Sequence, residues 1–329
     1  FFIFLFKKLE TQSYKKFFFL YGWLFGFGYF LTNIYWITIS LTFDQNFNFL
    51  IPFTLIIIPA FLAIFYGIFT LVFYLLRPKN ILSAFFLFSL LFGIIEFVRG
   101  IILTGFPWNL IVFSFSKNLD FISIISVIGT YSLNLITISF YTVPALYVLR
   151  KSKKEILVSI FLLVLPIFFF TYGSYQKKEF SNNELKKNSY TVRIIGSNIS
   201  ISRFYDNLET EKVINELISI SSPVREKKIF FIWPEGIIPN TYLDELDLYN
   251  DIMGRYFNKN HLIGLGITSR ETSNDDYKYY NSFSILDNNL NLIDYYNKIN
   301  LVPFGEFLPF ENILNKIGLR LITNRIESF

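Results

Sequence analysis

Five apolar stretches in the first 172 residues are long enough to cross a membrane, and they restrict the fold of that half more than any other feature. A helical span needs about 20 mostly apolar residues. The opening residues, FFIFLF, have the composition of the end of a sixth span. We therefore predict a helical membrane bundle over residues 1–172. Its full spans are expected roughly at 17–41, 49–76, 81–103, 121–149 and 156–172, the last being short.

The basic residues of this half gather in alternate loops. The loops at 7–16, 77–79 and 150–154 hold ten Lys and Arg side chains, whereas the intervening loops at 42–48 and 104–118 hold one, Lys117. Lys and Arg accumulate on the cytoplasmic side of membranes. This predicts that the chain after Tyr172 lies on the outer face.

The distribution of charge also bears on partners. The first 173 residues carry 12 Lys and Arg against 5 Asp and Glu, and the remainder carries 18 against 20. The net charge of +5 therefore comes from the membrane half, which argues against a nucleic-acid surface.

Two charged residues, Glu96 and Arg99, stand inside the third apolar stretch. Their spacing of three places them on one face of a helix, where pairing reduces the cost of burying either charge. We interpret them as a structural ion pair near the outer end of the helix. The segment TGFPWNL follows, in which Pro107 is expected to end the helix and Trp108 to lie at the depth of the membrane interface.

The second half has a different pattern. Residues 173–189 are polar and are predicted to form a linker. Beyond them, strand and helix patterns alternate, which is typical of an α/β domain with helices packed on a sheet. Strands are predicted at 190–197, 229–233, 261–269, 280–286 and 292–296, and helices at 206–221 and 243–259.

One acid, Glu235, comes directly after the apolar strand 229–233, in the sequence WPEG. Most charged loop residues face water, so a solvated turn is the simplest interpretation of Glu235 taken alone. Lys298 and Glu306 lie after the last predicted strand. Because chemistry in open α/β sheets gathers at strand ends, these three residues are candidates for one site.

The rest of the composition excludes several kinds of site. The chain has no cysteine and one histidine, His261, so it can form no disulfide, thiolate metal site, His-based triad or multi-His metal site. It also lacks a Gly-rich phosphate loop and any metal-ligand spacing. We predict no metal and no cofactor, and a structural role for His261 at the start of a strand.

Five segments resemble apolipoprotein N-acyltransferase, the bacterial inner-membrane enzyme that adds the third acyl chain to lipoproteins. In order along the chain they are GWLFGFGYFLTNIYWI (22–37), GFPWNL (105–110), WPEG (233–236), YYNSFSILD (279–287) and YNKINLVPFGEFLP (296–309). The resemblance implies a nitrilase-like αββα sandwich over residues 190–329, incomplete at its C-terminus. It also implies a multi-pass protein of the bacterial inner membrane whose soluble domain lies on the periplasmic face.

The resemblance implies roles for the strand-end residues. Glu235 matches the family's general base, Lys298 the lysine beside its nucleophile, and Glu306 a second glutamate near the site. Such a site transfers an acyl chain from a membrane phospholipid, through a cysteine thioester, to the N-terminal amine of a diacylated apolipoprotein. A carboxylate takes the proton of the attacking thiol, and a fixed ammonium stabilises the oxyanion that forms.

Aromatic residues are the expected lipid contacts. Phe304, Phe307 and Phe310 surround Glu306 and are expected to help cover the acyl chains, although a loop entering the bilayer or simple packing would also account for them. Tyr205 stands near the position of a family tryptophan and is a further candidate, but Ser200 replaces a family proline in that loop.

The nucleophile of the family is a cysteine that follows a further strand beyond the GEFLP segment, and this chain contains no cysteine. Two interpretations stay open: a fragment that lacks both ends, which we expect, or a natural pseudoenzyme. Two other functions also stay open. One is a membrane-tethered amidase that uses the same Glu, Lys and Cys roles, and the other is a non-catalytic membrane protein that binds lipid or lipoprotein.

Overall fold

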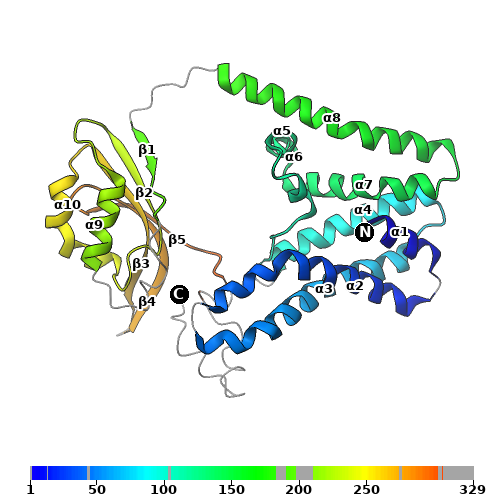
Figure 1. The fold of residues 1–329 in the computed structure, drawn as a ribbon, viewed down its shortest axis with the longest axis horizontal. Coiled ribbons are helices and arrows are strands. Elements are labelled where there is room, and N and C mark those ends of the chain that lie inside the picture. Colours follow the sequence, from blue (N-terminus) through cyan, green and yellow to red (C-terminus); the bar gives the residue numbers. More distant parts are fainter. Residues whose placement is uncertain are drawn as a thin grey trace. The chain divides into compact units, whose positions relative to one another are not determined.

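The computed structural model describes residues 2–12, 14–42, 45–102, 105–182, 190–197, 210–273, 276–302 and 306. The chain divides into two compact units, Phe1–Glu184 and Leu185–Phe329. The described part of the first unit is helical, and the strands belong to the second (Figure 1).

Long apolar helices dominate the first unit. Among the described residues, four helical segments are long and apolar enough to cross a membrane: Lys15–Thr42, Gln45–Leu76, Ile81–Ile101 and Lys153–Asn182. The described elements are α1 (Phe2–Thr11), α2 (Lys15–Ile34), η1 (Tyr35–Thr42), η2 (Gln45–Leu50), α3 (Ile51–Leu76), α4 (Ile81–Ile101), η4 (Ile111–Phe115), α5 (Leu119–Ile122), α6 (Ile125–Ile128), α7 (Thr130–Val148) and α8 (Lys153–Asn182).

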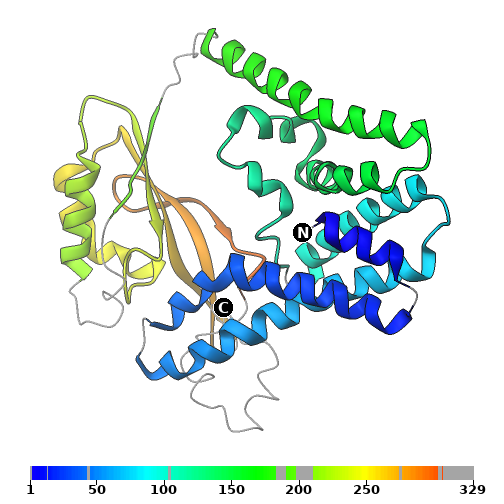
Figure 2. The ribbon, with the colours of Figure 1, turned by 45° about the vertical axis from the view of Figure 1, so that its right-hand side comes forward.

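Helices α2 and α3 run side by side, as Figures 1 and 2 both show. Small residues allow this approach: a Cβ atom added at Gly22 would clash with the carbonyl oxygen of Tyr66. The hydroxyl of Thr70 donates to the carbonyl of Phe18 at 2.7 Å across the same contact. Small residues and interhelical hydrogen bonds are the usual means of helix association in membranes, where lipid removes the hydrophobic drive between helices.

The outer surface of α3 is apolar. Ile57, Phe61, Ile64 and Ile68 recur at helical spacing and have exposed side chains. A contiguous exposed apolar surface of this kind is rare on a soluble protein. It fits contact with lipid and confirms the predicted membrane-spanning character of this half.

The predicted span at 121–149 is not one helix. It consists of α6, the short α5 before it, and α7, with Gly129 between α6 and α7 at φ +80°. That conformation costs a glycine little and interrupts the helix. The expectation of one continuous helix over residues 121–149 is therefore corrected.

The predicted linker at 173–189 also needs correction. Helix α8 continues to Asn182, and residues 183–189 lie outside the described part. The extension packs closely against α5: Gly173 lies directly against the backbone carbonyl of Asp120, where a Cβ atom would not fit. Ser174 and Lys177 also contact the Asp120 carboxylate, at 3.1 and 3.9 Å.

Glu96 and Arg99 form the predicted ion pair, with Arg99 Nη2 at 2.9 Å from Glu96 Oε2 and both side chains fully buried. The guanidinium also donates to the carbonyls of Phe106 and Trp108, so it ties the 105–110 segment to α4. Four of the five N–H groups of Arg99 donate to Glu96 or to these two carbonyls, which offsets part of the cost of burying the charges.

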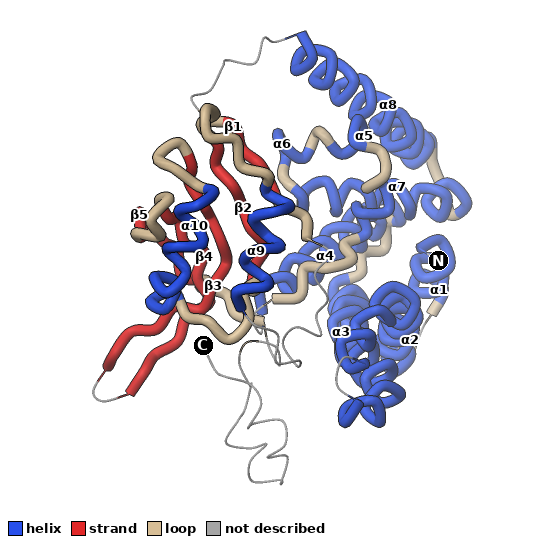
Figure 3. The backbone as a smooth tube through the Cα atoms, turned by 60° about the vertical axis from the view of Figure 1, so that its left-hand side comes forward, coloured by secondary structure: helices blue, strands red, loops and turns tan. Residues whose placement is uncertain are grey.

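The described part of the second unit forms a mixed five-stranded sheet in the order β1-β2-β3-β4-β5. Strands β1 to β3 are parallel, and the β3–β4 and β4–β5 pairs are antiparallel. The β3–β4 hairpin extends past its neighbours (Figure 3). The strands are β1 (Thr191–Ile194), β2 (Ile229–Glu235), β3 (His261–Ser273), β4 (Asp276–Leu286) and β5 (Leu292–Asn297).

Helices cover one face of this sheet, as Figure 3 shows. They are α9 (Thr210–Ser221), η6 (Leu243–Tyr249) and α10 (Asn250–Tyr256). Ile263, Leu265 and Ile267 alternate along β3 and are buried in the core beneath the helices. The predicted order of strands and helices is thus confirmed, as is the α/β class of the domain.

His261 has the structural role that the sequence indicated. Its ring is buried between Phe231 and Phe257, its Nδ1 accepts the backbone N–H of Asn258, and its Nε2 lies 3.1 Å from the carbonyl of Val224.

Candidate functional site

The position of Glu235 follows from the local sequence of β2. Ile229, Phe231 and Trp233 alternate into the helix-covered core. Pro234 cannot donate a ladder hydrogen bond, and the pairing with β3 shifts between Trp233 and Glu235. After this irregularity Glu235 pairs with Gly266 and is exposed.

Gly266 gives Glu235 the room it occupies. A Cβ added at Gly266 would lie 2.7 Å from the Cα of Glu235 and 3.1 Å from its Cβ. Since side chains alternate along a strand, Gly266 faces away from the buried side chains of Leu265 and Ile267. Glu235 therefore stands on the sheet face opposite the helices.

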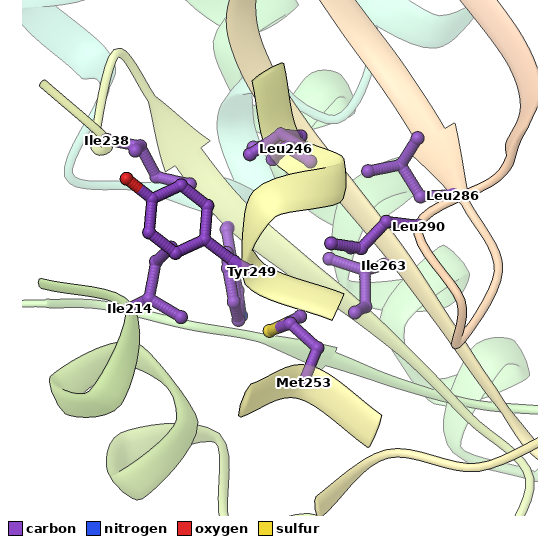
Figure 4. Close-up of a pocket in the computed structure, with 10 residues that line it drawn as sticks. Ile214, Ile238, Leu246, Tyr249, Met253, Ile263, Leu286 and Leu290 are labelled. Carbon is purple, nitrogen blue, oxygen red and sulfur yellow. The ribbon is translucent and has the colours of Figure 1, made fainter. Parts of the chain in front are cut away.

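The indole of Trp233 fixes the strand end from the other side. Its Nε1 donates to the hydroxyl of Ser221 on α9 at 2.9 Å, and both groups are buried. A void of about 10 Å³ lies in the same core (Figure 4). It is too small for a substrate. Its lining is apolar: Ile214, Trp233, Ile238, Leu246, Tyr249, Met253, Ile263, Leu265, Leu286 and Leu290.

Lys298 and Glu306 lie next to Glu235 at the end of β2. Lys298 Nζ lies 2.7 Å from Glu306 Oε1 and 3.5 Å from Glu235 Oε1. Lys298 follows β5 directly, and its backbone N–H donates to the carbonyl of Asn281 on β4 at 2.8 Å. The second oxygen of Glu306 accepts the backbone N–H of Val302 at 2.7 Å.

Asn281 completes the cluster. Its Nδ2 donates to Glu235 Oε1 at 2.6 Å and to Glu306 Oε1 at 2.5 Å. In the ladder Asn281 pairs with Thr268 on β3, two residues beyond Gly266, so it shares the face of Glu235.

The charges of the cluster support one another. Burial lowers the pKa of Lys298, but the hydrogen bond to Glu306 and the negative charge of Glu235 outweigh it, and the pKa is raised. Burial raises the pKa of Glu306, but hydrogen bonds from Lys298, from the N–H of Val302 and from Asn281 outweigh it, and the pKa is lowered. Lys298 and Glu306 are thus held as an ion pair.

This arrangement can perform acid–base work on a bound group. The side chain of Glu235 is 63% exposed and that of Glu306 is 14% exposed, so Glu235 is the carboxylate that an incoming group can reach. A carboxylate held by hydrogen bonds can accept a proton, and the adjacent ammonium can stabilise a developing oxyanion.

Three residues predicted from the sequence are therefore brought together: Glu235, Lys298 and Glu306. The four predicted substrate contacts, Tyr205, Phe304, Phe307 and Phe310, lie outside the described residues. Asn281 was not predicted. The signal that could have found it is a polar residue inside a predicted strand, within the segment YYNSFSILD; that strand is β4, two strands away from the one that ends at Glu235.

Comparisons of this chain with a family model and with known proteins give the same family name. Residues 1–143 match the family model described as the apolipoprotein N-acyltransferase N-terminal domain. Three similar bacterial proteins, described in turn, are named apolipoprotein N-acyltransferase. That of Allorhizobium ampelinum is 29% identical over 320 residues, which are 93% of this chain and 57% of the relative.

Two further relatives carry the same name. The protein of Rhodopseudomonas palustris is 30% identical over 316 residues, 92% of this chain and 58% of the relative. That of Rickettsia prowazekii is 32% identical over 303 residues, 89% of this chain and 58% of the relative. The chain thus spans less than two thirds of the length of these relatives.

Proposed function

Because the chain belongs to the apolipoprotein N-acyltransferase family, we propose that it supplies the base and the oxyanion-stabilising lysine of an acyl transfer between membrane-anchored substrates. The donor is a membrane phospholipid, and the acceptor is the N-terminal amine of diacylglyceryl-cysteine in an apolipoprotein. The observation that carries this proposal is the contact of Lys298 with both Glu235 and Glu306 at the end of β2.

The first half-reaction forms a thioester. Glu235 takes the proton of a cysteine thiol, and the sulfur attacks the ester carbonyl of the phospholipid. Lys298 stabilises the oxyanion of the tetrahedral intermediate. When the C–O bond breaks, the proton held by Glu235 passes to the departing alcohol, which leaves as a lysophospholipid.

The second half-reaction passes the acyl chain to nitrogen. The free amine of the lipoprotein attacks the thioester carbonyl, and Glu235 accepts a proton from the nitrogen. The C–S bond breaks, the amide forms, and the thiolate is protonated again. None of the 329 residues is a cysteine, so in this proposal the thiol belongs to a residue other than these 329.

We propose the nitrilase-like sandwich for the fold around this site. Support comes from the sheet face that carries Glu235, where Val192, Ile194, Phe283 and Tyr296 are exposed. Apolar side chains in this number on one face favour a second layer packed against it. The four predicted lipid contacts, which lie outside the described residues, remain proposals of the same kind.

We also propose that the second unit lies on the periplasmic face of the bacterial inner membrane. The support is the ten-to-one distribution of Lys and Arg between alternate loops of the first unit. A site on that face would meet lipoproteins after their export.

The experiment is complementation of a bacterial strain depleted of its own N-acyltransferase, using the complete reading frame that encodes this chain. The N-terminal peptide of a lipoprotein is analysed by mass spectrometry. We expect the wild type and Glu226→Gln, which changes an exposed acid before β2, to add the third acyl chain. Glu235→Gln should abolish the addition, because the amide cannot take the proton.

Full acylation by Glu235→Gln would refute the assignment of the base and would favour a protein that only binds lipid or lipoprotein. Release of ammonia from simple amides, without acyl transfer, would favour an amidase of the same fold.

A further inference from the structure

The side chain of Asn281 joins the two carboxylates of the candidate site. One nitrogen, Nδ2, donates to Glu235 Oε1 and Glu306 Oε1, at 2.6 and 2.5 Å. An amide NH₂ group has two hydrogens, so it can serve both acceptors at once. Lys298 Nζ contacts the same two oxygens, which closes a ring of two donors and two acceptors.

The two donors of this ring are not equivalent. Lys298 Nζ is close to Glu306, at 2.7 Å, and more distant from Glu235, at 3.5 Å. The shorter contact to Glu235 is the one from Asn281, at 2.6 Å. The ammonium is therefore committed mainly to Glu306, and the orientation of Glu235 depends mainly on the amide.

A neutral donor suits this position. The cluster holds two carboxyl groups and one ammonium, and the ammonium lies nearer to Glu306 than to Glu235. A second cation in place of Asn281 would hold Glu235 but would also weaken it as a base, and an ionised acid would repel it. An amide provides orientation without changing the charge.

We propose that Asn281 is the positioning residue that holds the Glu235 carboxylate in its reactive orientation beside Lys298. This inference rests on the proposed function, in which Glu235 is the base. A purely structural role is separable from it, because the link between Asn281 and Lys298 uses the backbone carbonyl and survives any side-chain substitution.

The test compares Asn281→Ala and Asn281→Asp with wild type in the complete protein, in detergent with a phospholipid and a diacylated lipopeptide. Asn291→Asp is the matched control, since the amide of Asn291 also donates to a carboxylate, that of Asp287 at 2.9 Å, in the turn after β4. We expect both Asn281 variants to lose about 100-fold in kcat at neutral pH, with KM nearly unchanged, as misplacement of a catalytic group does.

The pH profile separates positioning from packing. Among the described residues, the titratable groups at the Asn281 side chain are Glu235 on β2, Lys298 after β5 and Glu306, while its partner on β3, Thr268, does not titrate. An aspartate at 281 beside two carboxylates has a raised pKa, and once protonated it can donate one hydrogen bond.

The kcat of Asn281→Asp relative to wild type should therefore rise about tenfold or more as the pH falls from 8 to 5.5, a range chosen around the expected titration. The relative kcat of Asn281→Ala should stay low and flat. Wild-type kcat in both variants at every pH, with Glu235→Gln inactive, would overturn the inference and leave the proposed function intact.

A second readout does not depend on turnover. Lys298 is labelled by reductive ¹³C-methylation, and its resonance is assigned with Lys298→Arg. At acidic pH this resonance reports the ionisation of the neighbouring carboxylates. We expect its acidic midpoint to move upward in Asn281→Ala and to stay unchanged in Asn291→Asp.

An unchanged midpoint in Asn281→Ala would overturn the inference even if wild type showed no acyl transfer. If wild type transfers no acyl chain while the midpoint of Asn281→Ala is shifted, the proposed function is refuted. The proposed reactive orientation of Glu235 is then refuted with it.

Discussion

Adding one methyl group at Gly266 displaces Glu235 without changing any side chain of the candidate site. In Gly266→Ala the new Cβ lies 2.7 Å from the Cα of Glu235, whereas ordinary van der Waals contact begins at 3.4 Å. The two atoms have to separate by about 0.7 Å, the difference between these distances. The obstacle is backbone on a paired strand, so no side-chain rotation relieves it.

Two consequences can be estimated. Overpacking of a core costs about 1–3 kcal/mol of stability. Displacement of a catalytic group by about 1 Å costs on the order of 100-fold in rate, so a shift of about 0.7 Å should reduce kcat by roughly 10- to 100-fold. The loss should appear in kcat and leave KM nearly unchanged, because the residues proposed to hold lipid are not touched.

The assay measures acyl transfer and thermal unfolding of the complete protein in detergent. Gly264→Ala is the matched control: it lies two residues earlier on the same strand and face, and its Cβ would contact the ring ends of Phe283 and Phe230 instead of the Glu235 backbone. We expect Gly264→Ala to lose a similar amount of stability but to keep kcat within a few-fold of wild type. Wild-type kcat in folded Gly266→Ala would refute the placement of Glu235 as the base.

Three further results are expected. Arg99→Met should lower the unfolding temperature strongly, since it leaves a buried carboxylate without its partner at a cost of about 3–5 kcal/mol. Ser221→Ala should cost about 1–3 kcal/mol, because the buried indole N–H of Trp233 loses its acceptor, and calorimetry would measure this loss. Wild type should have a higher unfolding temperature than Glu306→Gln at pH values above the ordinary carboxyl pKa. This difference should disappear as the pH falls through the lowered pKa of Glu306. The difference should also disappear as the pH rises through the raised pKa of Lys298. Unfolding temperatures of both proteins measured from acidic to basic pH test the two expected losses.

The candidate site was largely predictable because its residues occupy strand ends. An apolar run that stops at WPEG predicts both a buried strand and a carboxylate at its end, and Lys298 follows the last strand in the same way. Glu96 and Arg99 were predictable as a pair because helical spacing alone places them on one face.

The features that were missed depend on contacts between distant residues. The extension of α8 to Asn182 is polar in sequence, and it is stabilised by Gly173 packing on Asp120, more than 50 residues away. Hydropathy does not report the positive φ of Gly129, which divides the expected span at 121–149. Asn281 joins the site only because the β3–β4 register sets it opposite Thr268, and register is not readable from one strand.

The most direct test of the proposed site is transfer of a labelled acyl chain from a phospholipid to a diacylated lipopeptide by the complete protein, followed by mass spectrometry. We predict that wild type adds one acyl chain to the peptide amine and releases one lysophospholipid, and that Glu235→Gln and Lys298→Met do neither while remaining folded. Equal transfer by wild type and Glu235→Gln would contradict the assignment of this cluster as the reactive centre.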